Sequence, residues 1–198
     1  MSTKSINKQY WVWANEPTHE GEALLYGSPS IIAQCGFLFN QGLAVPAHLP
    51  LIEFNQDENS QGIMTDNLIA AGFKGLLFST RLRKLLRFNG IHNFQEFPVL
   101  LHNRLNDTES REYALVNIIG LISCLDVENS RFKRSPTGDC PIEFIYKLVL
   151  NTSLIKNKEF FRLCEIPQIL IVNNKIKVAC ESAQITGVRF YAPEQYLF

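Results

Sequence analysis

The sequence predicts an α+β fold in which a few short helices pack on a mixed or antiparallel sheet. Segments of strand-like composition outnumber segments of helical periodicity, and the two kinds do not alternate strictly as in a doubly wound parallel sheet. Two stretches, at about 76–99 and 169–192, also follow the same order of residue types. The chain has 198 residues, 46% of them hydrophobic, so it can bury a sizeable core, and we expect a single domain over 1–198.

The two similar stretches predict two pseudo-repeated strand-helix-strand units. Each contains an apolar run, a polar capping residue, a segment of helical period, a turn and a second apolar run. Ser79 and Asn173 are the expected helix caps. The expected buried stripes are Leu82, Leu85 and Leu86 in the first unit and Ile176, Ala179 and Cys180 in the second. We interpret both units as scaffold.

The N-terminal third predicts strands around a long loop. The aromatic run at 9–14 is typical of a first strand, and 30–39 predicts a second one with a bend at its glycine. Proline, glycine and amide residues between 42 and 67 indicate a solvent-facing excursion around a short apolar piece at 51–54. Asp66 is the expected cap of a short helix that ends at Ala71.

The remaining segments predict further strands. Residues 111–119 are rich in β-branched side chains, and 143–150 alternate well enough for a half-exposed strand. Two more strands are expected at 159–163 and 168–172, on either side of Pro167. Strands therefore dominate the second half of the chain.

The composition and charge of the chain argue against several classes of function. Lys plus Arg and Asp plus Glu both total 19, so the chain has no global basic field of the kind that attracts nucleic acid or acidic membranes. The longest nearly uncharged run, at 113–125, is too short to cross a bilayer as a helix, which needs roughly 20 residues. The first residues lack a secretory h-region. We expect a cytoplasmic protein with no membrane association.

The sequence shows no residue pattern typical of a catalytic or metal-binding site. The five cysteines form no CxxC pair and are expected to be reduced and mostly buried, and the four histidines are scattered without metal-ligand spacing. No nucleotide-binding, nucleophile-elbow or zinc-protease motif occurs. We expect no metal, no cofactor and no enzymatic activity. A site that assembles only in space, such as Cys164 with His102, is the alternative.

Carboxylates cluster in three loops, at 16–22, 53–58 and 107–109. They are either solvated loop charges or a phosphate-like surface that enters the basic cleft of a protein partner. Exposed tryptophans would add interface anchors, since Trp is enriched at binding hot spots. The candidate partner-binding residues are Trp11, Trp13, Glu53, Asp57, Glu58 and Asp66.

A basic helix supports a different function. Its cations are Arg81, Arg83, Lys84 and Arg87. They could contact nucleic acid, but such a patch would need neighbouring aromatic residues or a second basic element. The neutral chain favours a plain solvated helix face, so nucleic acid is the disfavoured partner.

Several motifs resemble a known family. Residues 112–133 combine a tyrosine-containing strand and an Asn with a later Asp and Ser, here Tyr113, Asn117, Asp126 and Ser130. A phenylalanine-containing strand at 160–163 and a closing Gly-Val-Arg-Phe at 187–190 follow. This pattern resembles the bacterial polymorphic-toxin immunity proteins called immunity protein family eleven. The resemblance covers about 66–193, so residues 1–66 are the more variable region and 67–198 the family-like core.

The resemblance implies a protein that binds a cognate toxin encoded nearby and neutralises it by stoichiometric occlusion. It further implies a toxin that acts in the cytoplasm, with a nuclease delivered by contact-dependent or type VI secretion as the expected kind. The absence of catalytic motifs agrees with inhibition by occlusion. The sequence leaves open whether the free protein is a homo-oligomer.

Overall fold

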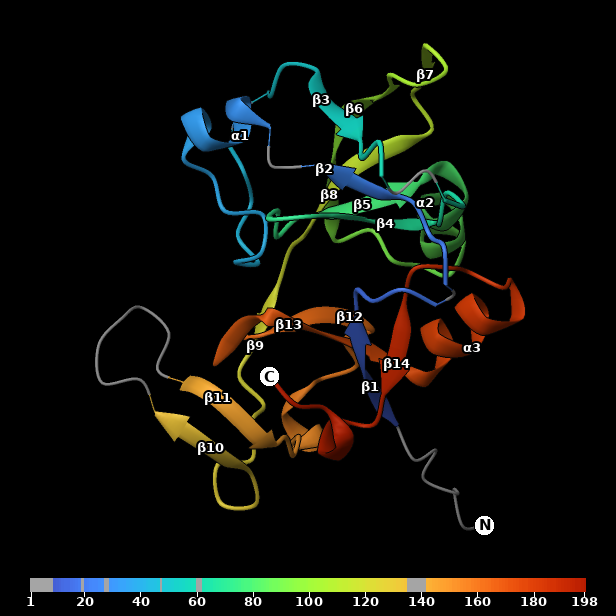
Figure 1. Ribbon diagram of the computed structural model, residues 1–198. Coiled ribbons are helices and arrows are strands. Elements are labelled where there is room, and N and C mark those ends of the chain that lie inside the picture. Colours follow the sequence, from blue (N-terminus) through green and yellow to red (C-terminus); the bar gives the residue numbers. More distant parts are fainter. Residues whose placement is uncertain (1–8, 19, 27–28, 47, 60–61, 135–141) are drawn as a thin grey trace.

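The structure is a computed structural model that describes residues 9–18, 20–26, 29–46, 48–59, 62–134 and 142–198. Figure 1 shows two bodies of strands, a barrel in the upper half and a five-stranded sheet in the lower half. The chain starts in the lower sheet with β1 (Tyr10–Ala14), builds the barrel, and returns to the lower sheet with β9 (Leu121–Ile122). In the amino-acid sequence, the barrel is therefore an insertion between β1 and β9 of the lower sheet.

The barrel closes because β3 pairs antiparallel with β2 and parallel with β6. Its strands, in spatial order, are β3 (Ile52–Gln56), β2 (Leu24–Tyr26), β4 (Asn67–Ala70), β5 (Leu76–Ser79), β8 (Tyr113–Ile118) and β6 (Phe94–Asn103). β7 (Thr108–Ser110) forms a hairpin with the end of β6. Large side chains such as Leu25, Phe54 and Leu115 fill the interior, because strand residues alternate between the two faces.

The lower sheet is antiparallel except for one parallel pair, β12 with β9. Its order is β14 (Arg189–Tyr191), β1, β13 (Ile166–Asn173), β12 (Phe160–Leu163) and β9. A separate two-stranded hairpin, β10 (Arg131–Arg134) with β11 (Ile142–Lys147), packs its buried Ile145 into the same core as Phe161 and Ile171. Short 3₁₀ turns lie at η1 (Thr152–Leu154) and η2 (Pro193–Gln195).

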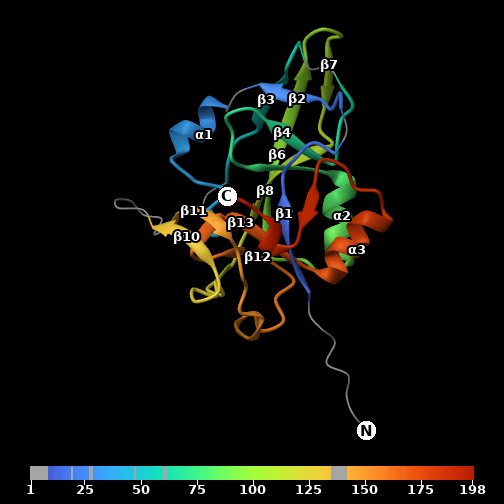
Figure 2. The ribbon, with the colours of Figure 1, turned by 60° about the horizontal axis from the view of Figure 1, so that its bottom comes forward.

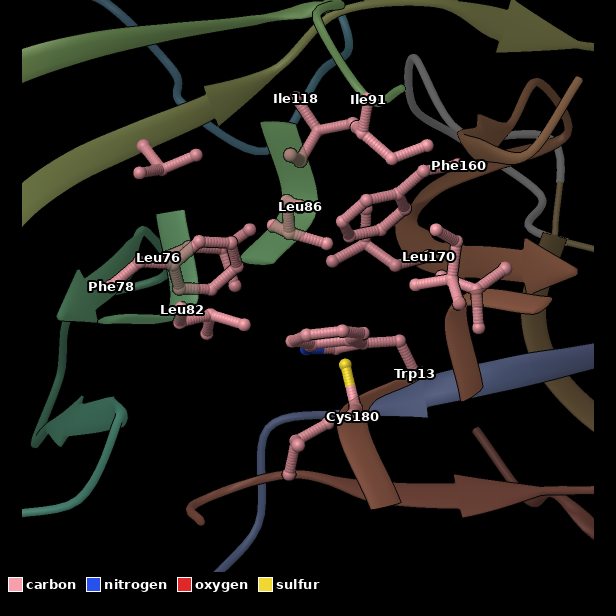
Figure 3. Packing of buried hydrophobic residues seen from close by; sticks show 14 of the residues in the cluster. Trp13, Leu76, Phe78, Leu82, Leu86, Ile91, Ile118, Phe160, Leu170 and Cys180 are labelled. Carbon is pink, nitrogen blue, oxygen red and sulfur yellow. The ribbon is translucent and has the colours of Figure 1, made fainter. Parts of the chain in front are cut away.

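The core between the two bodies is built around Trp13. Its ring stacks on Phe160 at 5.2 Å between centroids and lies 5.6 Å from Phe78 of the barrel. Leu82 of α2 (Thr80–Phe88) and Cys180 of α3 (Asn174–Ser182) belong to the same cluster (Figure 3). Aromatic contacts between residues distant in sequence thus join the barrel to the sheet.

The two helices also fasten each other's ends. Arg81 Nη2 donates to the carbonyls of Ala183 (2.6 Å) and Gln184 (2.7 Å) just after α3, while Lys175 Nζ donates to the carbonyl of Asn89 (2.6 Å) just after α2. Cations at the C-terminal end of a helix are favourable because unpaired carbonyls gather there. Figure 2 shows the two helices side by side.

The predicted repeats agree with the structure in some elements. Ser79 accepts from the amide of Leu82 and Asn173 from that of Ile176, so both expected caps form. The strands that follow differ, because β6 has ten residues and pairs with β3, β7 and β8, whereas the three-residue β14 pairs with β1. Equivalence of the two units stays a prediction.

Two predicted elements are wrong. The expected strand at 30–39 is instead a short helix, α1 (Ser30–Cys35), which ends where Gly36 adopts the left-handed conformation (φ 65°). The expected helix at 66–71 is β4, because Asn67 and Leu68 pair with β5. In both segments tertiary pairing or packing outweighs local propensity. The strands expected at 9–14, 111–119, 143–150, 159–163 and 168–172 are confirmed within a few residues.

Candidate functional site

An acidic surface lies on the barrel, along β3 and the β6–β7 hairpin. Glu53 points out of β3 between the buried Ile52 and Phe54, as the alternation of a strand requires. Asp57 and Glu58 follow directly in the loop after β3, and Glu109 comes from β7. We name Tyr26, Glu53, Asp57, Glu58 and Glu109 the acidic face.

Two adjoining grooves make these residues one surface. A groove of ≈ 470 Å³ is lined by Tyr26, Asp57 and Glu58, together with Arg104. A second groove of ≈ 450 Å³ is lined by Tyr26 and Glu53. Both grooves are also lined by Asn55, so the acidic residues on and after β3 lie around a common centre. Tyr26 stands at that centre with 73% of its surface exposed.

His102 of β6 connects the two edges of the acidic face. Its Nε2 lies 3.5 Å from Glu53 Oε2 and its Nδ1 lies 3.2 Å from Glu109 Oε1. The carboxylates of β3 and β7 are therefore held on either side of one imidazole. Glu58 is exposed and makes no ion pair among the residues that the structure describes. The face combines a fixed pair of carboxylates with a more freely solvated one.

An apolar groove borders the acidic face. It has a volume of ≈ 400 Å³ and is lined by Met64, His102, Glu109 and Tyr113, among others. Burial, helped by the nearby carboxylates of Asp66 and Glu112, raises the pKa of Tyr113 to about 12, and its hydroxyl donates to the carbonyl of Thr65 (2.8 Å). The tyrosine therefore stays neutral and serves as a fixed wall of this groove.

Three of the expected partner-binding residues lie away from this face. Trp13 is only 3% exposed and forms the central core contact, so the expectation that it is an exposed aromatic residue is wrong. Trp11 is half-buried, its indole N–H donates to Asn174 (3.1 Å), and Lys177 Nζ lies 4.6 Å from its ring centroid. The two tryptophans are two positions apart on β1 and therefore share one face, and Trp11 packs against the same core cluster as Trp13.

Asp66 is 8% exposed and joins the barrel to the lower sheet. Its carboxylate accepts from the hydroxyl of Ser79 (2.8 Å) and from the amide of Thr186 (3.1 Å), and Arg81 Nη2 lies 3.4 Å away. The neighbouring Asn67 donates to the carbonyl of Gly187 (2.8 Å). These bonds commit Asp66 to the fold, which separates it from the exposed carboxylates of the acidic face.

Most of the cationic side chains of the basic helix bond to other groups of the protein. Arg83 pairs with Glu96 at 2.8 Å, and Arg87 pairs with the other oxygen of the same carboxylate at 2.8 Å. Arg81 binds the end of α3, as described above. Lys84 is exposed and makes no ion pair within the described part of the chain. Three of the four cations are thus engaged within the protein, which weakens the nucleic-acid interpretation of α2.

A second cationic surface, on the β10–β11 hairpin, is absent from the sequence-based candidates. Arg131 lies 5.6 Å from the ring centroid of Tyr146, and Lys133 lies 5.7 Å from that of Phe144. Both rings are about half exposed, at 51% and 47%. The alternation of Arg and Lys in 131–134 opposite the aromatic residues of 144–146 was a usable signal, because facing residues of two paired strands interact.

No group of three or more metal-ligating side chains converges in the described residues. Cys164 is exposed beyond the end of β12 and His102 lies on β6, in a different sheet, where its ring contacts Glu53 and Glu109. Among the three cysteines whose side chains the structure describes, Cys124 and Cys180 are buried, Cys164 is exposed, and all are free thiols. Cys140 lies outside the described residues.

In the described parts of the chain, no helix is long and apolar enough to span a membrane. The search of curated proteins gives no match to the chain. A family model described as "Immunity protein family (Imm11)" matches residues 9–195. The match includes the N-terminal strand, the barrel and the lower sheet, which is nearly the whole chain. On this evidence the chain belongs to the immunity protein family Imm11.

Proposed function

We propose that this protein neutralises a cognate toxin by binding it stoichiometrically through the acidic face. Membership in the immunity protein family implies immunity to a toxin. The observation that carries the finer proposal is the meeting of Glu53, Asp57 and Glu58 around the exposed ring of Tyr26. The proposed toxin is a nuclease that acts in the cytoplasm and is encoded beside the immunity gene.

The chemistry of the acidic face fits a basic cleft. A nuclease must hold phosphates with Lys and Arg, and carboxylates spaced along a strand and its following loop can occupy the same positions. Complementary charge also accelerates encounter between the two proteins, which matters for an inhibitor that must act before its target does. Tyr26 supplies a large amphipathic anchor at the centre, while the carboxylates surround it.

Occlusion needs no reactive group in the inhibitor. The acidic face offers carboxylates and an exposed tyrosine ring for contact with a partner. Family membership likewise suggests a non-enzymatic inhibitor. We therefore propose that binding alone, at one immunity protein per toxin, blocks the toxin's substrate site.

The first experiment is co-purification with the product of the adjacent upstream gene. A stable one-to-one complex and the loss of nuclease activity in that complex are the expected results. If the two purified proteins show no binding at micromolar concentration, the proposal fails.

Variants then locate the interface. Tyr26→Ala and Glu58→Gln each remove one element of the acidic face and should raise Kd by about 10-fold or more, as for a hot-spot residue. Glu194→Gln removes a carboxylate that is also exposed, from η2, far along the chain, and should leave Kd unchanged. An effect of Glu194→Gln as large as that of Glu58→Gln would indicate a general charge effect and would contradict the proposed surface.

A further inference from the structure

A buried arginine that pairs with no carboxylate of the described residues lies between the barrel and the lower sheet. Arg162 of β12 is 2% exposed. Its guanidinium donates to three backbone carbonyls, those of Ile118 (3.4 Å), Pro167 (2.9 Å) and Phe39 (3.1 Å). These acceptors come from the barrel, the lower sheet and the loop after α1. The side chain thus joins three separate segments.

No carboxylate of the described residues lies within ion-pair distance of Arg162. Burial lowers the pKa of the guanidinium to about 10, and no opposite charge among the described residues offsets this effect. Carbonyl dipoles stabilise the cation only in part, and an uncompensated charge in a protein interior is costly. A guanidinium has five N–H donors, so two remain after the three carbonyl bonds.

A cavity of ≈ 280 Å³ adjoins this cation. Arg162 and Lys74 supply its positive charge, and the lining contains no Asp or Glu. Its other walls are the side-chain amides and aromatic residues of Asn15, Asn40, Gln168, Trp13, Phe73, Tyr196 and Phe198. The buried indole N–H of Trp13 and the buried side-chain oxygen of Gln168 make no hydrogen bond to any residue that the structure describes.

We propose that this cavity binds a small organic carboxylate, with the carboxylate on Arg162 and an apolar body against the aromatic walls. A planar carboxylate matches the two N–H groups that remain on the guanidinium and compensates its single charge. Lys74, which is exposed, adds attraction at the entrance. The volume accommodates a ligand of roughly ten non-hydrogen atoms, on the basis of about 30 Å³ for each water-sized unit.

The ligand would couple the two bodies of the fold. Its anion would stabilise a cation whose acceptors lie in the barrel, in the lower sheet and in the loop after α1. Binding of this kind raises the melting temperature, because the unfolded chain has no such site. This site is separate from the acidic face, so its existence does not depend on toxin binding.

Calorimetric titration of the full chain with benzoate, together with thermal melting in its presence, tests the proposal. Saturable one-to-one binding of benzoate and a rise in Tm are expected. Benzamide, which has the same shape without the charge, should bind at least 10-fold more weakly. Three results would overturn the assignment: no benzoate binding at millimolar concentrations, benzamide binding as tightly as benzoate, or inorganic phosphate binding more tightly than benzoate.

Two substitutions place the ligand. Arg162→Lys keeps the charge but loses the planar fork, and should weaken benzoate binding by about 10-fold or more. Lys74→Gln removes the exposed cation at the entrance and should weaken binding about 3-fold or more. Lys84→Gln on α2 is the matched control and should have no effect. If Lys74→Gln and Lys84→Gln bind benzoate as the wild type does, the anion is not in this cavity.

Discussion

Replacement of Asp66 should destabilise the protein far more than replacement of an exposed loop carboxylate. The buried carboxylate accepts from the Ser79 hydroxyl at 2.8 Å and from the Thr186 amide at 3.1 Å. Hydrogen bonds to a charged group contribute about 1.5 kcal/mol each at the lower end of measured values, so these two give about 3 kcal/mol. Asp66→Ala also leaves both donors without an acceptor. We expect the free energy of unfolding to fall by about 3 kcal/mol.

Urea unfolding followed by far-UV circular dichroism measures this change. Glu58→Ala, which removes an exposed carboxylate, is the control and should stay within about 0.5 kcal/mol of wild type. A double-mutant cycle of Asp66→Ala with Ser79→Ala should give a coupling energy of about 1 kcal/mol or more, because the side chains bond directly. A loss below about 0.5 kcal/mol for Asp66→Ala would refute the assignment of this residue to the fold.

Three further outcomes are expected. Arg81→Gln should lower the unfolding free energy by about 0.5–1 kcal/mol through loss of the contact at the end of α3, whereas Lys84→Gln should leave it unchanged in the same urea titration. Burial raises the pKa of both Cys124 and Cys180 from 9.0 to about 12, so between these values the folded state keeps protons that the unfolded state loses. The melting temperature should therefore fall as pH rises from 9 toward 12. This fall should be shallower in Cys180→Ala. At pH 8 an aromatic disulfide reagent mapped by mass spectrometry should modify the exposed Cys164 readily and the two buried thiols only after denaturation, and rapid labelling of either buried thiol in the native protein would contradict the packing described here.

The sequence was sufficient to predict those features of the fold that depend on residues close together in the chain. The caps Ser79 and Asn173 form as expected because the bond from a capping side chain to the third following amide is decided within one turn. The α+β class also follows from the count and order of the segments. Closure of the barrel could not be predicted, because it depends on the parallel pairing of β3 with β6 between residues about 47 positions apart.

Of the candidate site, the sequence predicted only the acidic residues and not their arrangement in space. Glu53, Asp57 and Glu58 were recognisable as an exposed acidic group because they sit in a polar segment. Asp66 has the same chemistry, and only the position of Thr186 and Ser79 beside it in space shows that it is buried. Trp13 was misassigned for a related reason, since an aromatic residue on a strand can face either the core or a partner. Tyr26 and Glu109 join the acidic face only through the barrel.

Hydrogen exchange of the protein with and without its cognate toxin tests most directly whether the acidic face is the interface. Amide hydrogens that a partner covers exchange more slowly, so the region of protection maps the contact surface. We predict new protection in β2, in 52–59 and in the β6–β7 hairpin, with none in α2. Protection confined to the β10–β11 hairpin or to α2, with unchanged exchange along β3, would contradict the account.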